Sequence, residues 1–529
     1  MSRYKKAAIV GLILLPVVVG GFVVQERAAL GGARLFEQVV AIVGERYVDS
    51  LDTGVLYEKA ARGLVTELKD PYAELYSAKQ LESFNTTTGG FYAGVGMQIE
   101  PQEGAIVISK VFPNTPAAEA GIMEGDRVVA VDSQSTRGWK LEQVSSKLKG
   151  PPGTKVSARF ARQSAAEQFT VQFTRRVVRI PAVPYAMMLE NKTAYIPVQG
   201  FNETAAEEVA KELQRLSADG AKGVVLDMRG NPGGFLDQAL TMTNLFLDKG
   251  KEILAVRGRG QPEQKAFAER TPIAPKIPLV ILTDGYTASA SEIVAGALQD
   301  HDRALIVGTT SFGKGLVQSL YKLDGGYAIK LTTAKWYTPS GRSIQKERKL
   351  TDDGQLVEVR PDSLESDSAR RSRPVFKSDG GRVVYGGGAI TPDIIIPYDT
   401  LTSAEQKLAR ALSSKQQESY VTLYQYGSEL KGKVKPDFEV TPEMKEEFYA
   451  RLQKKGVNID RKDWDAGLTY VDRLLDNRIA RFAFGDSTAK RRDLHDDPQL
   501  RKALELLKRG QSQKDLLAMA AAVPAKPSR

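Results

Sequence analysis

The sequence predicts a multidomain α/β protein, and three observations carry this prediction. The chain has 529 residues, enough for about three or four domains of ordinary size. Its content of 42% hydrophobic and 26% charged residues is typical of a folded, water-soluble chain rather than of a disordered or multi-span membrane protein. In the middle of the chain, apolar strand-like runs alternate with helical stretches, as in an α/β core; these runs are TAYIPVQGF, GVVLDMRG, PLVILTDG and ALIVGTT.

Residues 1–27 are expected to be a signal peptide or a membrane anchor. Arg3, Lys5 and Lys6 precede an uncharged, mostly apolar run of 18 residues from Ala7 to Val24. This length lies between the apolar core of a cleaved signal peptide and the ~20 residues of a membrane-spanning helix. Small residues suited to a signal peptidase are badly placed, so a retained anchor is favoured and a cleaved signal is the alternative. We therefore expect an exported, periplasmic protein that is held at the inner membrane.

The rest of the chain divides into four segments according to the spacing of its apolar residues and the positions of Gly and Pro. Apolar residues first recur at helical spacing, and short alternating strands separated by Gly and Pro follow, with one helix near Lys140 to Leu148. Pro181 and Pro184 then mark a boundary before the α/β core. After about residue 401 the pattern is helical again, and Thr441 and Asp497, each followed by proline, are expected helix N-caps. The expected segments are an N-terminal helical cap at 35–88, a small β domain at 89–176, a core at 181–400 with an exposed insertion at 346–388, and a C-terminal helical extension at 401–529.

Composition excludes several kinds of site. The chain has no cysteine, which rules out disulfides, thiolate metal sites and a cysteine nucleophile. Its two histidines, His301 and His495, cannot form a three-histidine zinc site, so we expect no metal and no cofactor. The net charge of +10 comes from scattered residues without a nucleic-acid-binding motif, so we expect no nucleic-acid partner.

Three segments of the core carry residues suited to nucleophilic catalysis: DMRGNPGG at 227–234, TDGYTASASEIVAGALQD at 283–300 and TSFGKGLVQ at 310–318. A serine at a strand-to-helix turn has its hydroxyl beside unpaired N–H groups and the positive end of the helix dipole, which favour an oxyanion. On an extended strand, Lys314 and Gln318 would point to one face, and a desolvated, neutral lysine can replace histidine as a base. Glycine-rich backbone in the first segment could bind an oxyanion.

Each of these residues also has a structural interpretation. Ser289 and Ser291 could both be helix caps, Ser291 is a rival nucleophile, and Lys314 could be a solvated lysine in a turn. Asp227 and Arg229 are interpreted as a structural ion pair. His301 lies 12 residues after Ser289, too far along a helix to complete a triad, and is expected at the surface.

Together the three segments resemble the C-terminal processing peptidase family, also called tail-specific proteases, over roughly residues 35–401. That resemblance implies a crotonase-like α/β protease core with a Ser/Lys dyad. The nucleophile would be Ser289 in S-A-S-E, the base Lys314 in F-G-K-G, 25 residues later, and the orienting amide Gln318, four residues after that. No part of the family that we can place matches the region after about residue 401.

The same resemblance implies an oxyanion hole. It would consist of the Ala290 N–H and the backbone of Gly233 or Gly234, with the choice between the two glycines open. One departure is Asp284, where the family often has asparagine; it leaves the dyad intact.

The segments YAGVGMQI and GDRVVAVD resemble a PDZ domain. Gly94 and Gly96, flanking Val95, leave backbone N–H groups free to hold a chain-terminal carboxylate, and the strand from Met97 offers an edge to which a peptide can add. The helix carrying Val144 and Leu148 would form the other wall of the groove. The alternative is a small β domain with a structural role only.

The function expected from these residues and this resemblance is that of a serine endopeptidase of the cell envelope. It would recognise accessible C-terminal tails of protein substrates through its PDZ domain and cleave through an acyl-enzyme. The alternatives are a PDZ-based periplasmic adaptor with an inert core, and an acyl-CoA-processing crotonase relative. The C-terminal extension is expected to form a homo-oligomer or to dock an adaptor protein.

Overall fold

The computed structural model describes residues 31–102, 105–162, 167–351, 356–358, 373–398 and 401–522. The expected signal or anchor at residues 1–27 lies outside these ranges. No helix in the described ranges is long and apolar enough to cross a membrane. The chain forms two compact units: the first takes residues from segments 1–79, 318–332 and 348–357, and the second contains the remainder.

The first unit combines helices with strands. A helix over residues 31–46 precedes α2 (Thr53–Glu67), and β1 (Glu74–Tyr76) pairs antiparallel with the first half of β18 (Ala328–Tyr337). β17 (Leu316–Lys322) also pairs with β18. The strand β1 interrupts a segment that was expected to be helical, because it is stabilised by pairing with residues about 250 positions later, which a local pattern cannot reveal.

A small antiparallel β domain follows α3 (Ala78–Gly89). Its main sheet has the order β3-β4-β5-β7-β8, with β6 beside β5, and β2 pairs with β9 where the chain enters and leaves the domain. The elements are β2 (Phe91–Gly94), β3 (Met97–Gln102), β4 (Ala105–Val111), α4 (Pro116–Glu119), β5 (Arg127–Val131), β6 (Gln134–Ser135), α5 (Leu141–Leu148), β7 (Lys155–Ala161), β8 (Phe169–Thr174) and β9 (Arg176–Arg179).

The core of the second unit is a six-stranded sheet of order β10-β11-β12-β15-β16-β23, in which only β10 is antiparallel to its neighbour. The strands are β10 (Met187–Leu189), β11 (Thr193–Pro197), β12 (Gly223–Asp227), β15 (Leu279–Thr283), β16 (Leu305–Gly308) and β23 (Ile394–Ile395). The four apolar runs singled out in the sequence are β11, β12, β15 and β16 with the residues that follow them. A hairpin of β13 (Glu252–Gly258) and β14 (Gln264–Phe267) pairs with the end of β18.

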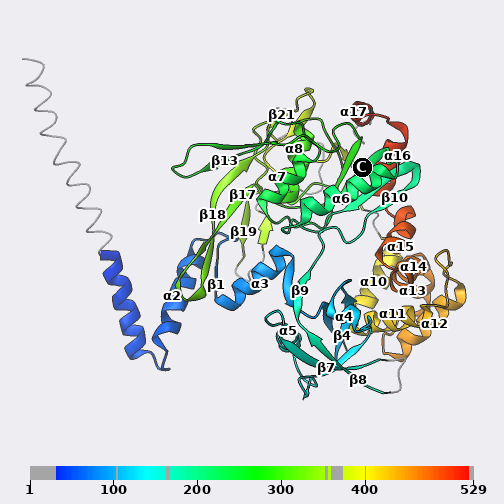
Figure 1. Ribbon diagram of the computed structural model, residues 1–529, viewed down its shortest axis with the longest axis horizontal. Coiled ribbons are helices and arrows are strands. Elements are labelled where there is room, and N and C mark those ends of the chain that lie inside the picture. Colours follow the sequence, from blue (N-terminus) through cyan, green and yellow to red (C-terminus); the bar gives the residue numbers. More distant parts are fainter. Residues whose placement is uncertain are drawn as a thin grey trace, which may run out of the picture. The chain divides into compact units, whose positions relative to one another are not determined.

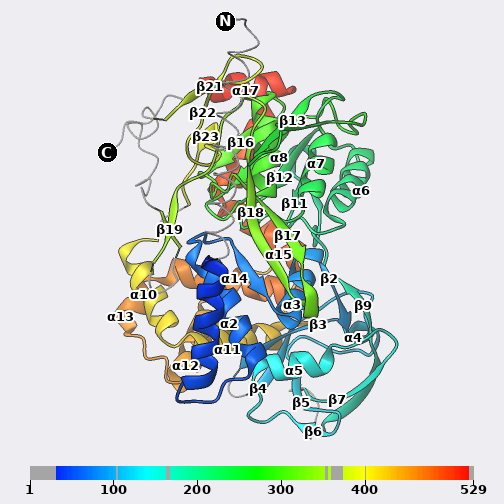
Figure 2. The same cartoon turned by 90° about the vertical axis from the view of Figure 1, so that its left-hand side faces the viewer.

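Both faces of this sheet are buried, and alternate residues face opposite sides. One face packs with α6 (Ala205–Ala218), α7 (Leu236–Asn244) and α8 (Ala290–Asp300), and Figure 2 shows these helices beside β11 and β12. It contributes Ala194, Ile196, Val224, Leu226, Leu279, Ile281 and Ile306. The other face contributes Tyr195, Val225, Val280, Leu282, Leu305 and Val307, which pack against α16 (Pro498–Arg509) and α17 (Gln513–Ala521) (Figure 1). The end of the C-terminal extension is therefore a layer of the core.

The preceding part of the extension forms a helical subdomain with its own core, which includes Leu408, Phe448, Trp464 and Leu475. Its helices are α10 (Ser403–Ser414), α11 (Gln416–Leu430), α12 (Pro442–Lys454), α13 (Arg461–Ala466), α14 (Leu468–Phe484) and α15 (Asp486–Arg492). The two expected N-caps are confirmed, because the side chain of Thr441 accepts from the N–H of Met444, and that of Asp497 from Leu500.

Within the expected exposed insertion at 346–388, residues 373–388 mix exposed side chains with buried ones. This part forms a hairpin of β21 (Val375–Lys377) and β22 (Val383–Tyr385), in which Val384 is buried. Arg382 pairs with Asp302 and Asp393 of the core. A polar, glycine-rich sequence suggested exposure, but Asp379 and Arg382 of this segment form ion pairs with residues of the core. The middle of the insertion lies outside the described residues.

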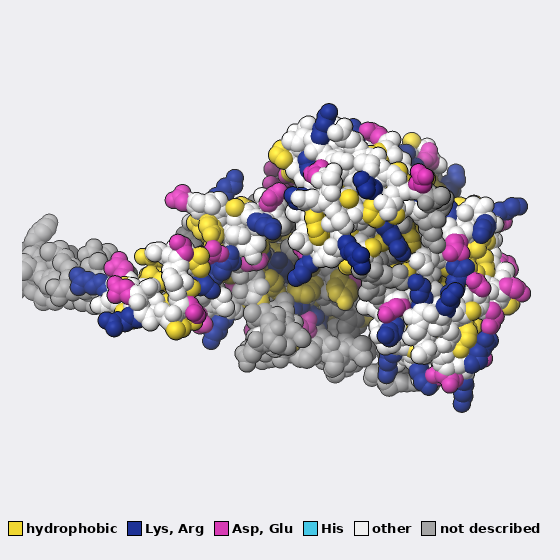
Figure 3. All heavy atoms as spheres, turned by 90° about the horizontal axis from the view of Figure 1, so that it is seen from below, with side chains coloured by type: hydrophobic (Ala, Val, Ile, Leu, Met, Phe, Trp, Pro, Cys, Tyr) yellow, Lys and Arg dark blue, Asp and Glu magenta, His cyan; other side chains and the backbone are white. Residues whose placement is uncertain are grey.

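The charges are mixed on the face shown in Figure 3, where Lys and Arg side chains alternate with Asp and Glu. This agrees with the scattered distribution of basic residues along the sequence.

Candidate active site

Two of the three sequence segments meet at one edge of the core sheet. β12 and β15 are parallel neighbours that end at Asp227 and Thr283, so the loops that follow them lie side by side. Three hydrogen bonds join these loops: Gly230 N–H donates to Asp284 at 3.0 Å, the Thr287 hydroxyl to the Met228 carbonyl at 2.9 Å, and Ala288 N–H to the Asn231 carbonyl at 3.0 Å.

Asp284 organises the turn that leads to Ser289. Its Oδ1 accepts N–H groups of Gly230, Tyr286 and Thr287, each at 3.0 Å, and its Oδ2 accepts the Tyr398 hydroxyl at 3.0 Å. A carboxylate accepts at both oxygens, so aspartate at this position can receive all these donors.

Ser289 lies immediately before α8 in a backbone conformation that few residues adopt. Its φ and ψ are 54° and −114°, and such positive-φ geometry in a non-glycine residue stores strain that the surrounding structure must hold in place. The side chain is half-buried. The next residue, Ala290, is the first of the helix, so its N–H has no acceptor within its own helix.

Glu292 holds Ser289 and the lysine segment together. Its Oε2 accepts the N–H of Ser289 at 2.8 Å and of Lys314 at 2.9 Å, while its Oε1 accepts the N–H of Gly313 at 2.6 Å and the Ser311 hydroxyl at 2.5 Å. Burial raises the pKa of Glu292, and these four donors oppose that rise. The buried carboxylate therefore fixes the backbone on both sides of the candidate dyad.

Glu292 was missed in the sequence, although a signal was present. Serine followed three residues later by glutamate is the pattern of a helix capping box, and Glu292 does bond back to the N–H of Ser289. The bonds to the segment 311–314 could not be foreseen, because they depend on the tertiary fold.

Lys314 lies in an irregular loop and is half-buried. The Trp336 indole donates to its carbonyl at 3.1 Å, and Gly315 N–H donates to Gln345 at 2.8 Å, so the backbone of the loop is fixed on this side as well. Ser289 and Lys314 are joined through the Glu292 carboxylate, which accepts the backbone N–H of each.

The extended strand expected from 314 to 318 begins only at Leu316, and Gln318 lies within it, in β17. Gln318 belongs to the first unit. Its Nε2 is buried and has no hydrogen-bond partner among the described residues.

The two candidate oxyanion glycines differ in the atoms that surround them. Gly233 has a φ of +93°, and a Cβ there would lie 2.6 Å from the Ala288 carbonyl oxygen and 2.9 Å from Ala290 N, so its backbone lies directly against the start of α8. Its N–H donates to the Asn231 side chain at 2.9 Å. At Gly234, a Cβ would lie 2.2 Å from the Phe201 carbonyl oxygen. Both positions require glycine.

Two residues that were considered as alternatives have structural roles here. Ser291 is fully buried, and its hydroxyl donates to the Asn231 carbonyl at 3.2 Å. The expectation that His301 is at the surface is wrong: its side chain is 7% exposed and bonds to Asp379 at 2.8 Å and to the Glu252 carbonyl at 2.7 Å.

In the small β domain, Gly94 to Met97 form the connection between β2 and β3. Gly96 has a φ of +92°, and a Cβ there would lie 2.1 Å from Thr115 Cβ, so only glycine fits. Its carbonyl accepts the N–H of Phe112 at 3.0 Å, and that of Val95 accepts the N–H of Ala117 at 2.8 Å.

The proposed walls of the peptide groove are deeply buried. Val144 and Leu148 on α5 are 0% and 4% exposed and pack with Val95 and Met97 in the core of the domain. Their role toward a peptide stays a prediction.

Comparison with known proteins agrees with this architecture. Residues 192–356 match peptidase family S41, and residues 107–162 match the PDZ domain. The chain is 36% identical over 301 residues to the carboxy-terminal processing protease CtpA of Bacillus subtilis, with 57% of this chain and 64% of the relative covered. It is 36% identical over 315 residues to the carboxy-terminal-processing protease of Bartonella bacilliformis, with 59% and 72% covered. The solved photosystem II D1 C-terminal processing protease is 27% identical, with a TM-score of 0.34 and coverage of 62% and 91%.

An α/β core joined to a PDZ domain and a helical C-terminal region thus defines a multidomain peptidase-like protein. The chain belongs to peptidase family S41, together with the carboxy-terminal processing proteases, which confirms the resemblance found in the sequence. It spans 64% of the length of the Bacillus relative, so activity, substrates and partners are proposals.

Proposed function

We propose that this protein is a serine endopeptidase that acts through a Ser289/Lys314 dyad on a crotonase-like core. The observation that carries the proposal is the Glu292 carboxylate, which binds the N–H groups of both residues. A clamp of this kind is expected where a nucleophile and its base must keep a fixed relation.

In this mechanism the Ser289 hydroxyl attacks the scissile carbonyl while the neutral Lys314 amine accepts its proton. Lys314 then donates that proton to the departing amine, which leaves an acyl-enzyme that water hydrolyses by the reverse proton path. Gln318 would orient the lysine or the substrate with its amide. No step requires a metal or a cofactor.

The oxyanion would be bound by the Ala290 N–H and a glycine N–H. Because the Gly233 N–H is already donated to Asn231, we favour Gly234 as the second donor, with Gly233 keeping the space beside Ala290 open.

The test is digestion of an unstructured protein with an apolar C-terminus. We expect Ser289→Ala, Lys314→Ala and Lys314→Arg to be folded and inactive, because a guanidinium stays protonated and cannot act as a base. Ser291→Ala is the matched control for the rival nucleophile and should retain activity. Cleavage by folded Lys314→Ala protein, or its loss in Ser291→Ala, would refute the dyad. Chelators should leave cleavage unchanged.

We further propose that the PDZ domain selects substrates by their C-terminal tails. The connection from Gly94 to Met97 leads into the edge of β3, the kind of edge to which an extended peptide can add. Amidating the tail removes its carboxylate and should weaken cleavage of the same substrate. Equal cleavage of free and amidated tails would contradict tail recognition, and binding of tails without any cleavage would favour the alternative of an adaptor with an inert core.

The location is proposed from the sequence alone. The cationic, apolar segment 1–27 would take the protein to the periplasm and hold it at the inner membrane. The full chain should sediment with membranes, and its accumulation in the cytoplasmic fraction would contradict this proposal.

A further inference from the structure

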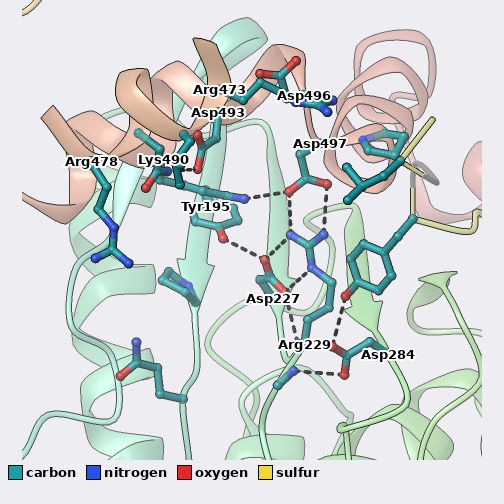
Figure 4. A pocket seen from close by; sticks show the side chains of 18 of the residues that line it. Tyr195, Asp227, Arg229, Asp284, Arg473, Arg478, Lys490, Asp493, Asp496 and Asp497 are labelled. Atoms are coloured by element: carbon teal, nitrogen blue, oxygen red, sulfur yellow. Dashed lines mark hydrogen bonds and ion pairs between the residues drawn. The ribbon is translucent and has the colours of Figure 1, made fainter. Parts of the chain in front are cut away.

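A buried ionic network joins the C-terminal helices to the glycine-rich loop of the active site (Figure 4). The Arg229 guanidinium lies between two carboxylates. It donates to Asp227 at 2.9 and 2.6 Å and to Asp497 at 2.9 and 2.8 Å, and to Gln499 at 3.0 Å. All five of its N–H donors are thereby used.

Arg229 lies in the loop that is hydrogen-bonded to the turn of the proposed nucleophile. It is the second residue after β12, in the loop whose Met228, Gly230 and Asn231 bond the turn that ends at Ser289. The same loop continues to Gly233, whose backbone lies against Ala290. A displacement of Arg229 would therefore be transmitted to both the nucleophile turn and the oxyanion glycines.

Asp497 connects this loop to the far end of the chain. Its Oδ1 also caps α16 by accepting the Leu500 N–H at 3.0 Å, and its Oδ2 accepts from Lys490 at 2.6 Å. Gln499, fully buried, donates to the Ile396 carbonyl at 2.8 Å. Because α16 packs on the core sheet, Asp497 is a fixed point against which Arg229 is held.

The charged side chains are largely buried and lie beside an opening. The side chains of Arg229, Asp227 and Asp497 are 11%, 8% and 11% exposed. A pocket of about 760 Å³ opens next to them and is lined from the core by Val198 and Gly230, among others. On the pocket side, the ion pairs of Arg229 therefore add to the hydrogen bonds that hold this loop.

We propose that Asp497 is a positioning residue: through Arg229 it fixes the loop 228–234 in the geometry that the reaction requires, so that the rate of chemistry depends on the docking of α16. This inference rests on the proposed function and adds the C-terminal extension to the machinery of the site.

The test uses the full chain and a p-nitrophenyl ester, which requires the serine and the oxyanion hole but no C-terminal tail. In a burst experiment the amplitude counts competent sites, whereas the burst rate reports acylation. Asp497→Asn keeps an N-cap for α16 but removes the charge that holds Arg229. We expect a burst rate about 10- to 100-fold lower, as for a small misplacement of reacting groups, and a nearly unchanged amplitude, because the same loop serves acylation and deacylation and both rates fall together.

The matched control is Asp460→Asn, since Asp460 caps α13 by accepting the N–H of Lys462 from its own helix. It should behave as wild type. Arg229→Lys is the second variant, because an ammonium cannot bridge two carboxylates with a planar fork, and it should also lower the burst rate.

A wild-type burst rate in folded Asp497→Asn, or a lower amplitude at an unchanged rate, would overturn the inference and leave Asp497 a purely structural cap. If Asp497→Asn does not fold, a normal burst rate in folded Arg229→Lys overturns it instead. Failure of the proposed function gives a different result: the wild-type chain would then show no ester cleavage that is lost in Ser289→Ala.

Discussion

Replacing Glu292 by glutamine tests the clamp that joins the two halves of the proposed dyad. The carboxylate receives four donors, two on each oxygen. A glutamine of nearly the same shape presents one oxygen and one NH₂ group, so two of the four donors then face another donor. The change therefore alters hydrogen bonding while it preserves volume.

The loss of stability in Glu292→Gln depends on how the glutamine amide is oriented. If its NH₂ replaces Oε1, the Ser311 hydroxyl can turn to accept, and the Gly313 N–H is left without an acceptor. If it replaces Oε2, the N–H groups of Ser289 and Lys314 are both left unpaired. An unsatisfied buried donor costs about 1–3 kcal/mol, so the first orientation is preferred and the variant should lose about 1–3 kcal/mol of stability. With a usual stability of about 5–15 kcal/mol, it still folds.

Urea unfolding and proteolysis of an unstructured substrate measure the two consequences. We expect a lower free energy of unfolding and a larger relative loss of kcat, because the Gly313 N–H, next to Lys314, loses its Oε1 acceptor and the lysine segment is held less firmly. Glu208→Gln is the matched control: Glu208 accepts one backbone N–H, from Val183, and one hydroxyl, from Thr204, both of which glutamine can satisfy, so the change should be about 0.5 kcal/mol or less. A Glu292→Gln protein as stable and active as wild type would refute the clamp.

Three further predictions follow from local geometry. Gly233→Ala places a Cβ 2.6 Å from the Ala288 carbonyl oxygen and 2.9 Å from Ala290 N at a φ of +93°, so the start of α8 must shift, and both the free energy of unfolding and, by about 100-fold or more, kcat should fall; wild-type kcat would exclude the role of Gly233 in keeping the oxyanion site open. Gly96→Val meets Thr115 and should reduce the advantage of free over amidated tails, measured as the ratio of their cleavage rates; an unchanged ratio would contradict the assigned role of this loop. Burial acts to raise the pKa of Asp497, but Arg229 and Lys490 outweigh it and hold that pKa below its usual value. The stability it contributes is thus complete above the unfolded pKa of about 3.9 and is lost as pH falls further. The free energies of unfolding of wild type and Asp497→Asn should differ most at neutral pH and converge in acid. A difference that grows in acid would contradict the lowered pKa of Asp497.

The strands of the core and the position of the candidate nucleophile could be predicted because their signals are local. Continuous apolar runs ending in polar or glycine-rich residues gave β12 and β15, and the loops after them carry Asp284 and Ser289, where parallel strands bring such loops together. The apolar period also predicted the helical character of the extension.

What the sequence did not reveal depends on pairing between distant segments. Nothing around Asp497 indicates that it meets Arg229, 268 residues earlier. His301 was expected in solvent from its place at the end of the helix that follows Ser289, and its partner Asp379, 78 residues later, gave no local signal. In both cases the partner lies far away along the chain, and a local pattern cannot supply it.

The covering of the core sheet by α16 and α17 sets an order of events during synthesis. Leu500 to Leu516 are made more than 200 residues after Ser289, so one face of the sheet stays uncovered while everything between them is produced. Val225, Val280 and Leu282 can then only pack transiently, and a growing chain that contains every proposed catalytic residue still lacks a closed core. The sheet, and the candidate site at its edge, can therefore reach the final packed state only after the last helices have been made.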